Sequence, residues 1–119
     1  MQMYVYLNKL NAIITNYYRK LIKDKNAIIN IDYYPDNSAM FAHISIQTNK
    51  KLKRLESEFY LDKYELNLII NSYVYNTGFV STGFDYKIID GKFISISANI
   101  SPLDQKIKTK RRKLWNSRN

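Results

Sequence analysis

The chain has 119 residues, of which 45% are hydrophobic, and it carries 19 Lys and Arg against 10 Asp and Glu. This length suits a single domain with its own core. The sequence has neither a long uninterrupted apolar stretch nor the charged start and cleavage site of a secretory signal, so we expect no membrane span and no signal peptide. Cysteine is absent. This excludes disulfides and thiolate chemistry and fits a reducing, intracellular compartment, either cytoplasm or organelle matrix.

Residues 3–22 are predicted to form an amphipathic helix, because apolar side chains recur at alternating intervals of four and three residues. The stripe consists of Met3, Leu7, Leu10, Ile14, Tyr17 and Leu21. It spans fewer than three heptads and lacks consistent flanking charges. Packing against the protein's own sheet is therefore favoured over a coiled-coil seam.

Residues 26–48 are predicted to form a β-hairpin around the turn sequence Pro-Asp-Asn-Ser at 35–38. Pairing Tyr34 with Ala39 across this turn fixes a register. It sets Tyr33 opposite Met40, Ile31 opposite Ala42, Ile29 opposite Ile44 and Ala27 opposite Ile46. One face is then apolar, and the other face, with Phe41 and His43, is mixed, which is typical of an antiparallel pair with one buried face.

Residues 49–61 fit two structures, either a short helix or a basic connector that leads into a strand. A second helix is predicted to begin after Asp62, whose side chain can cap it, with Glu65 three residues further on. The sequence Asn-Thr-Gly at 76–78 is expected to end this helix, because Gly78 can adopt the left-handed conformation that closes a helix.

Residues 84–100 are predicted to form a second hairpin around Asp90 and Gly91. A two-residue turn mismatches the faces, although glycine suits it, whereas a three-residue loop at 90–92 matches them. The longer loop sets Ile88 opposite Ile94, Tyr86 opposite Ile96 and Phe84 opposite Ala98. Pro102 is expected to end the strand.

The order helix, hairpin, helix, hairpin predicts an α+β fold with one four-stranded antiparallel sheet and two or three helices on its apolar face. Residues 1–103 form the globular domain, and residues 104–119 form a basic C-terminal arm. The segments FAHISIQTN and FISISANIS share a rhythm that a diverged internal repeat would explain. One core is expected to contain Ile29, Ile31, Ile44, Ile46, Leu66, Ile69, Ile70, Ile88, Ile94 and Ile96.

The positive charge is concentrated in the arm, where seven Lys and Arg residues stand against Asp104 and leave +6 of the formal net charge of +9. The arm is too polar to pack alone. Its cations can neutralise phosphates while Trp115 stacks on a base, a combination typical of RNA binding. The predicted nucleic-acid contacts are Lys106, Lys108, Lys110, Arg111, Arg112, Lys113, Trp115 and Arg118.

Two further basic clusters precede the arm. The second cluster, Lys50, Lys51, Lys53 and Arg54, is also predicted to contact nucleic acid. The third cluster, Arg19, Lys20, Lys23 and Lys25, lies at the end of the first predicted helix, where cations also favour the helix dipole. Stabilisation of the helix therefore explains the third cluster as well as nucleic-acid binding does.

The candidates for catalysis are weak. His43 is the only histidine, and a lone strand histidine is usually a surface residue. Asp85 and Lys87 have the spacing of a metal-nuclease strand motif, which needs another acid such as Asp32 or Asp62 close by. The three glycines form no phosphate-binding loop. We expect no catalytic residue, no metal, no cofactor and no small-molecule substrate.

The leading hypothesis is a non-catalytic nucleic-acid-binding component of a ribonucleoprotein, with RNA favoured and other proteins of a larger assembly as further partners. A small α+β body with a charged extension resembles many ribosomal proteins. Residues 62–100, a helix followed by Gly-aromatic and a hairpin, resemble part of the eighth protein of the small ribosomal subunit. The resemblance covers a third of the chain, lacks that family's Ser-Thr-rich C-terminal signature, and assigns no residue a role.

The abundance of Ile, Lys, Asn and Tyr indicates an A/T-rich coding genome, such as that of an organelle, a phage or another mobile element. This supports an organellar ribosomal protein. It equally supports the alternative, a small phage or mobile-element protein that binds and inhibits a host nucleic-acid enzyme or defence nuclease. The 11 tyrosines favour this alternative, since tyrosine is enriched at protein interfaces.

Overall fold

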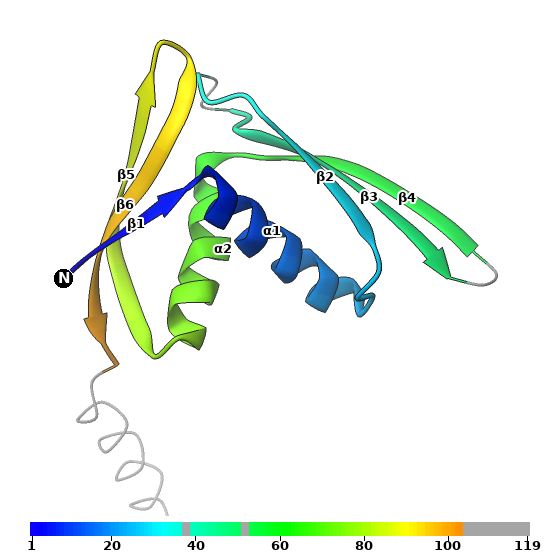
Figure 1. Ribbon diagram of the computed structural model, residues 1–119, viewed down its shortest axis with the longest axis horizontal. Coiled ribbons are helices and arrows are strands. Elements are labelled where there is room, and N and C mark those ends of the chain that lie inside the picture. Colours follow the sequence, from blue (N-terminus) through cyan, green and yellow to red (C-terminus); the bar gives the residue numbers. More distant parts are fainter. Residues whose placement is uncertain (37–38, 51–52, 104–119) are drawn as a thin grey trace, which may run out of the picture.

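The computed structural model describes residues 1–36, 39–50 and 53–103. The elements are β1 (Gln2–Tyr6), α1 (Leu7–Ile22), β2 (Ile28–Tyr33), β3 (Ala42–Lys50), β4 (Lys53–Leu61), α2 (Lys63–Asn76), β5 (Phe79–Ile89) and β6 (Lys92–Pro102). They form two antiparallel three-stranded sheets, with orders β1-β6-β5 and β2-β3-β4. The two sheets diverge from one another, and both helices lie in the angle between them (Figure 1). The prediction of one four-stranded sheet in a helix-hairpin order is therefore wrong.

The two predicted hairpins do not pair with each other, and β1 and β4 each add a third strand to one of them. β1 occupies the start of the expected first helix and pairs with β6, with Val5 buried opposite Ile96. Tyr6 is extended and is the N-cap of α1, so the helix begins at Leu7 rather than at Met3. β4 pairs with β3, so residues 53–61 are a strand and not a helix.

The connectivity divides the chain into two equivalent halves. Each half has the order strand, helix, strand, strand: β1-α1-β2-β3 and β4-α2-β5-β6. The first strand of each half pairs with the last strand of the other half, β1 with β6 and β4 with β3. Helix residues 10–18, LNAIITNYY, match residues 66–74, LNLIINSYV. The similarity first seen between the segments FAHISIQTN and FISISANIS thus extends to the complete strand-helix-strand-strand order of each half.

Equivalent side chains make equivalent hydrogen bonds in the two halves. The Tyr33 hydroxyl donates to Asn11 Oδ1 at 2.5 Å. The Tyr86 hydroxyl donates to Asn67 Oδ1, also at 2.5 Å. Asn11 and Asn67 are the second residues of the two matched helix segments. Each helix is therefore tied to the first strand of the hairpin that follows it.

Four aromatic rings join the two halves where their hairpins meet. Phe41 lies 5.3 Å from Tyr86 and 5.9 Å from Phe93 between ring centroids, and Tyr33 stacks on Phe93 at 6.2 Å. Phe41 has no exposed surface. It was predicted to lie on the mixed outer face, and this prediction is wrong because the β2–β3 connection turns its ring into the core.

The first hairpin has a register that differs from the predicted one by two residues. Ile31 is opposite Ile44, Ile29 is opposite Ile46, and Tyr33 is opposite Ala42. The connection is longer than the four-residue turn at 35–38, since the Tyr34 N–H donates to the Phe41 carbonyl at 2.6 Å. Because side chains alternate with a period of two, this shift leaves the isoleucines on the predicted inner face.

The second hairpin has the shorter of the two turns considered. Ile89 is opposite Lys92, and both turn residues have positive φ, 52° at Asp90 and 72° at Gly91, as a two-residue primed turn requires. A register shift between Lys87 and Ile88 skips Ile94 and restores the predicted pairs Tyr86 with Ile96 and Phe84 with Ala98. The three-residue loop is wrong, and Ile94 is 38% exposed rather than in the core.

The second helix has the predicted ends. Asp62 Oδ1 accepts a hydrogen bond from the Glu65 N–H at 2.8 Å, α2 ends at Asn76, and Gly78 has a φ of 93°. In α1 the predicted stripe is partly wrong, because Leu7 and Leu21 are exposed. The core of the described residues includes Leu10, Ile13, Ile14, Tyr18, Ile44, Ile46, Leu66, Ile69, Ile70 and Ile96.

Three tyrosines, the buried Tyr18 and the half-buried Tyr33 and Tyr86, predict that the protein loses stability at alkaline pH. Burial raises the pKa of Tyr18 to about 12, with smaller contributions from Tyr17 and Glu65, and burial also raises the pKa of Tyr33 and Tyr86. The unfolded chain therefore loses these protons first. The stabilisation is fully present below pH about 10 and is lost as the pH rises toward the folded-state pKa values.

We expect the urea midpoint to be constant between pH about 7 and 9 and to fall between pH about 10 and 11.5. The double variant Tyr33→Phe/Tyr86→Phe should start from a lower midpoint but show a shallower alkaline fall. Equal pH dependence of the two proteins would contradict the assignment to these hydroxyls.

Candidate nucleic-acid interface

The predicted contacts of the arm, Lys106, Lys108, Lys110, Arg111, Arg112, Lys113, Trp115 and Arg118, lie outside the described residues. The structure does place the point from which the arm departs. The Leu103 N–H donates to the Gly78 carbonyl at 3.0 Å, and the Ile100 N–H donates to the Met1 carbonyl at 2.8 Å. The arm therefore leaves from the end of β6, beside the start of β5.

The second cluster lies at the outer end of the β3–β4 hairpin (Figure 1). The backbone register sets Lys50 opposite Lys53 and Asn49 opposite Arg54. Lys51 lies outside the described residues. The hairpin thus brings the described residues of this cluster to one end of a sheet.

The third cluster joins the second at the same end of this sheet. β2 begins at Ile28, which is opposite Gln47 near the end of β3. The loop that carries Lys23 and Lys25 directly precedes β2. The described residues of two clusters about 25 residues apart in the sequence therefore lie toward one end of the molecule, here called the basic end, which sequence analysis did not predict.

Within the third cluster the residues have different roles. The Arg19 Nε–H donates to the Ala27 carbonyl at 3.2 Å and holds the loop after α1. Lys23 adopts the left-handed conformation, with a φ of 56°, and its N–H bonds the last turn of α1. The side chains of Lys20, Lys23 and Lys25 are exposed. These three supply the free positive charge, whereas Arg19 has a structural role.

The two basic segments lie at the ends of equivalent strands. Residues 50–54 span the end of β3, the last strand of the first half, and the start of β4, whereas residues 104–119 follow β6, the last strand of the second half. In Figure 1 the outer end of the β3–β4 hairpin and the end of β6 lie on opposite sides of the molecule. The two basic segments are therefore attached at different ends of the fold.

The candidate catalytic residues lie on the outer faces of the sheets. His43 Nδ1 is 3.9 Å from Asp32 Oδ2, and the His43 ring lies 4.9 Å from that of Tyr60. Asp85 and Lys87 are exposed on β5. Asp62 caps α2, and its negative charge adds to burial in raising the pKa of Tyr86. Tyr86 points to the opposite face of β5 from Asp85.

None of the described His, Asp and Glu residues form a group of three that could hold a metal ion. The two helices described are also too short or too polar to cross a membrane.

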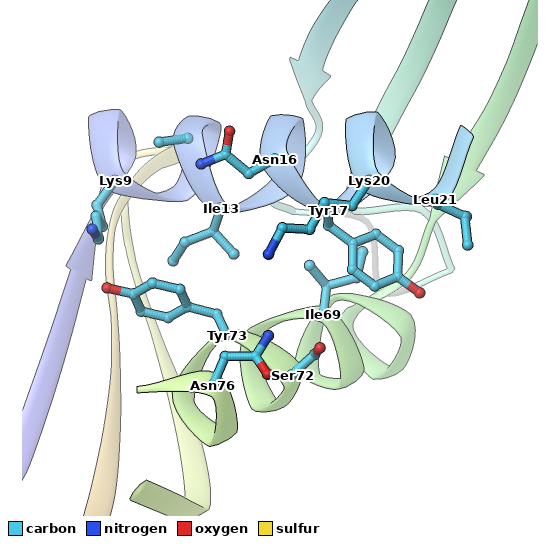
Figure 2. A pocket seen from close by; sticks show the side chains of 11 residues that line it. Lys9, Ile13, Asn16, Tyr17, Lys20, Leu21, Ile69, Ser72, Tyr73 and Asn76 are labelled. Atoms are coloured by element: carbon cyan, nitrogen blue, oxygen red, sulfur yellow. The ribbon is translucent and has the colours of Figure 1, made fainter. Parts of the chain in front are cut away.

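A groove lies between α1 and α2, and sequence analysis did not predict it (Figure 2). Its volume is about 320 Å³. Its walls are equivalent residues of the two halves, Ile13 with Ile69 and Tyr17 with Tyr73. The match between residues 10–18 and 66–74 was the signal that could have indicated a paired-helix surface.

Comparisons with models of protein families, with curated proteins and with solved structures find no match. The resemblance of residues 62–100 to a ribosomal protein therefore rests on those residues alone.

Proposed function

We propose that this protein is a non-catalytic nucleic-acid-binding component of a ribonucleoprotein, with RNA as the favoured partner, and that the C-terminal arm is its principal contact. The observation that carries the proposal is the +6 charge of residues 104–119 around Trp115. The basic end formed by the second and third clusters supports it, because it offers a second place for phosphates. An organellar ribosome is one assembly that such a component would suit.

The salt dependence of binding tests this proposal. Each neutralised phosphate releases condensed counterions, so affinity should fall steeply with salt. Seven arm cations correspond to a slope of log affinity against log salt of up to about −5 on a single strand. The measurement is fluorescence anisotropy with a labelled single-stranded RNA at several salt concentrations, with DNA of the same sequence as the comparison. A salt-independent affinity, or none, would refute the proposal.

Trp115→Ala separates stacking from charge. If the indole stacks on a base, the substitution should weaken binding by about 1–3 kcal/mol. The slope against salt should stay the same, because no charge is removed. The matched control is Lys113→Ala, which should flatten the slope by about 0.7. A Trp115→Ala variant that binds like the parent would show that the ring does not touch the nucleic acid.

The second candidate function is a mobile-element protein that binds and inhibits a host nucleic-acid enzyme. Exposed tyrosines on both the sheet and the helix sides favour it, including Tyr4, Tyr6, Tyr64 and Tyr75, each more than half exposed. Native purification distinguishes the two candidates. Co-purifying nucleic acid supports the first, and a stoichiometric host enzyme that is inhibited supports the second.

A further inference from the structure

The groove between α1 and α2 has an apolar interior that is open to solvent (Figure 2). Ile13 and Ile69 face it from the two helices, although each belongs to the core and is only 4% exposed, and Tyr73 and Tyr17 lie toward its two ends. Leu21, at the end of α1, is 63% exposed beside it. A hollow of about 320 Å³ is large enough to receive several apolar side chains of another molecule.

The charge of this groove is positive and comes from one side. Lys9 and Lys20 line it from α1, whereas α2 contributes Ser72 and Asn76. No described lining residue is acidic. Lys9 and Lys20 are eleven residues apart, which is about 16 Å along a helix. The counterpart of Lys9 in the second half is Glu65, and that of Lys20 is Asn76, so the two halves have diverged here in charge.

Charge excludes two possible occupants. A second copy of the chain would bring the same two lysines against this groove. The chain's own arm carries +6. Both would place like charges close together, which opposes association.

A nucleobase also fits the groove poorly. Stacking needs a free aromatic face, but Lys9 Nζ already lies 4.9 Å from the centroid of the Tyr73 ring. Tyr17 is in an edge contact with Tyr18, with centroids 5.1 Å apart. Ile13 and Ile69 offer no hydrogen bonds to the edges of a base. These contacts favour an apolar ligand with separate anionic groups.

We propose that this groove binds an amphipathic, acidic helical segment of a partner protein. Apolar side chains of the segment would lie over Ile13 and Ile69 and contact the more exposed Tyr17, Tyr73 and Leu21 around them, as in other helix-in-groove complexes. Its carboxylates would meet Lys9 and Lys20, up to about three helical turns apart. Because the cations lie only on α1, they would fix the orientation of the segment. The groove shares Lys20 with the third basic cluster but does not include the C-terminal arm, the principal contact proposed for nucleic acid.

The test uses two labelled model peptides of about 18 residues, long enough to form a helix on binding. One has Leu at alternating intervals of three and four and Glu elsewhere. The other has the same Leu positions with Lys in place of Glu. We expect saturable, micromolar binding of the acidic peptide to the full chain and none of the basic peptide. Lys9→Glu/Lys20→Glu should weaken binding at least about tenfold, since it reverses both complementary charges.

Two further variants serve as controls. Lys87→Glu/Lys92→Glu makes the same charge change on exposed residues outside the groove and should alter peptide affinity by less than about threefold. Ser72→Phe fills the groove without a change of charge, and it should also lower the affinity for the acidic peptide at least about tenfold. The affinity of this variant for single-stranded RNA should stay at the parent value. Circular dichroism melting checks that each variant is folded.

Three results would overturn the proposal. The first is an acidic peptide that does not saturate below about 1 mM. The second is an equal drop in affinity in the two double-charge variants, which would indicate non-specific attraction. The third is displacement of the peptide by RNA together with weaker RNA binding by Ser72→Phe, which would make the groove a nucleic-acid site. Neither of the first two results would affect RNA binding by the arm, so the two proposals can fail separately.

Discussion

Removal of residues 104–119 is expected to lower the affinity for single-stranded RNA by about 100-fold or more at low salt. The deletion takes away seven cations and the only tryptophan. The slope of log affinity against log salt should flatten by up to about 0.7 for each phosphate that the arm would have neutralised. Anisotropy titrations of the two proteins over a range of salt concentrations measure both quantities.

The same deletion should leave the free energy of unfolding nearly unchanged, since exposed charges contribute little to stability. The matched control is Lys50→Gln/Lys53→Gln at the opposite basic end, which removes two cations and keeps the arm. It should reduce RNA affinity by less than the deletion does. If the truncated chain melts instead, the arm is part of the fold, and the host-enzyme inhibitor becomes the better hypothesis.

Phe41→Ala is expected to destabilise the protein by about 3–5 kcal/mol. The ring is completely buried and contacts Tyr33, Tyr86 and Phe93 from both halves of the chain. Its removal would leave a cavity at the junction of the two hairpins, where the neighbouring strands cannot collapse independently. Urea unfolding at neutral pH gives the free energy directly.

Two controls define the origin of this effect. Phe41→Leu keeps most of the volume and should cost less than Phe41→Ala. Ile94→Ala, at a position that is 38% exposed and skipped by the β5–β6 register, should cost less than about 1 kcal/mol. A larger destabilisation at Ile94 than at Phe41 would show that the observed register of the second hairpin is wrong.

Several features of the protein were determined by the sequence itself, because they depend on neighbours in the chain. Asp62 caps α2 through the N–H of a residue only three positions away. Gly78 has the positive φ that ends the helix. The period of two kept the isoleucines of the first hairpin on one face even though its register was wrong by two residues. The charge of the arm is also a property of the sequence alone.

The tertiary structure decided the features that depend on distant partners. The residues of β1 satisfy a helical spacing as well as a strand alternation, and pairing with β6, about 90 residues away, selects the strand. Pairing with β3 likewise selects the strand for residues 53–61. A local pattern cannot choose between these structures, because the backbone hydrogen bonds that stabilise a strand come from another part of the chain.

The turn of the second hairpin and the position of Phe41 depend on the same kind of distant contact. Local turn chemistry at Asp90 and Gly91 prevailed over apolar matching because a bulge beyond the turn restored the inner pairs. Phe41 is buried because rings from the other half surround it. The groove between α1 and α2 exists only because the exchange of first strands places the two equivalent helices side by side.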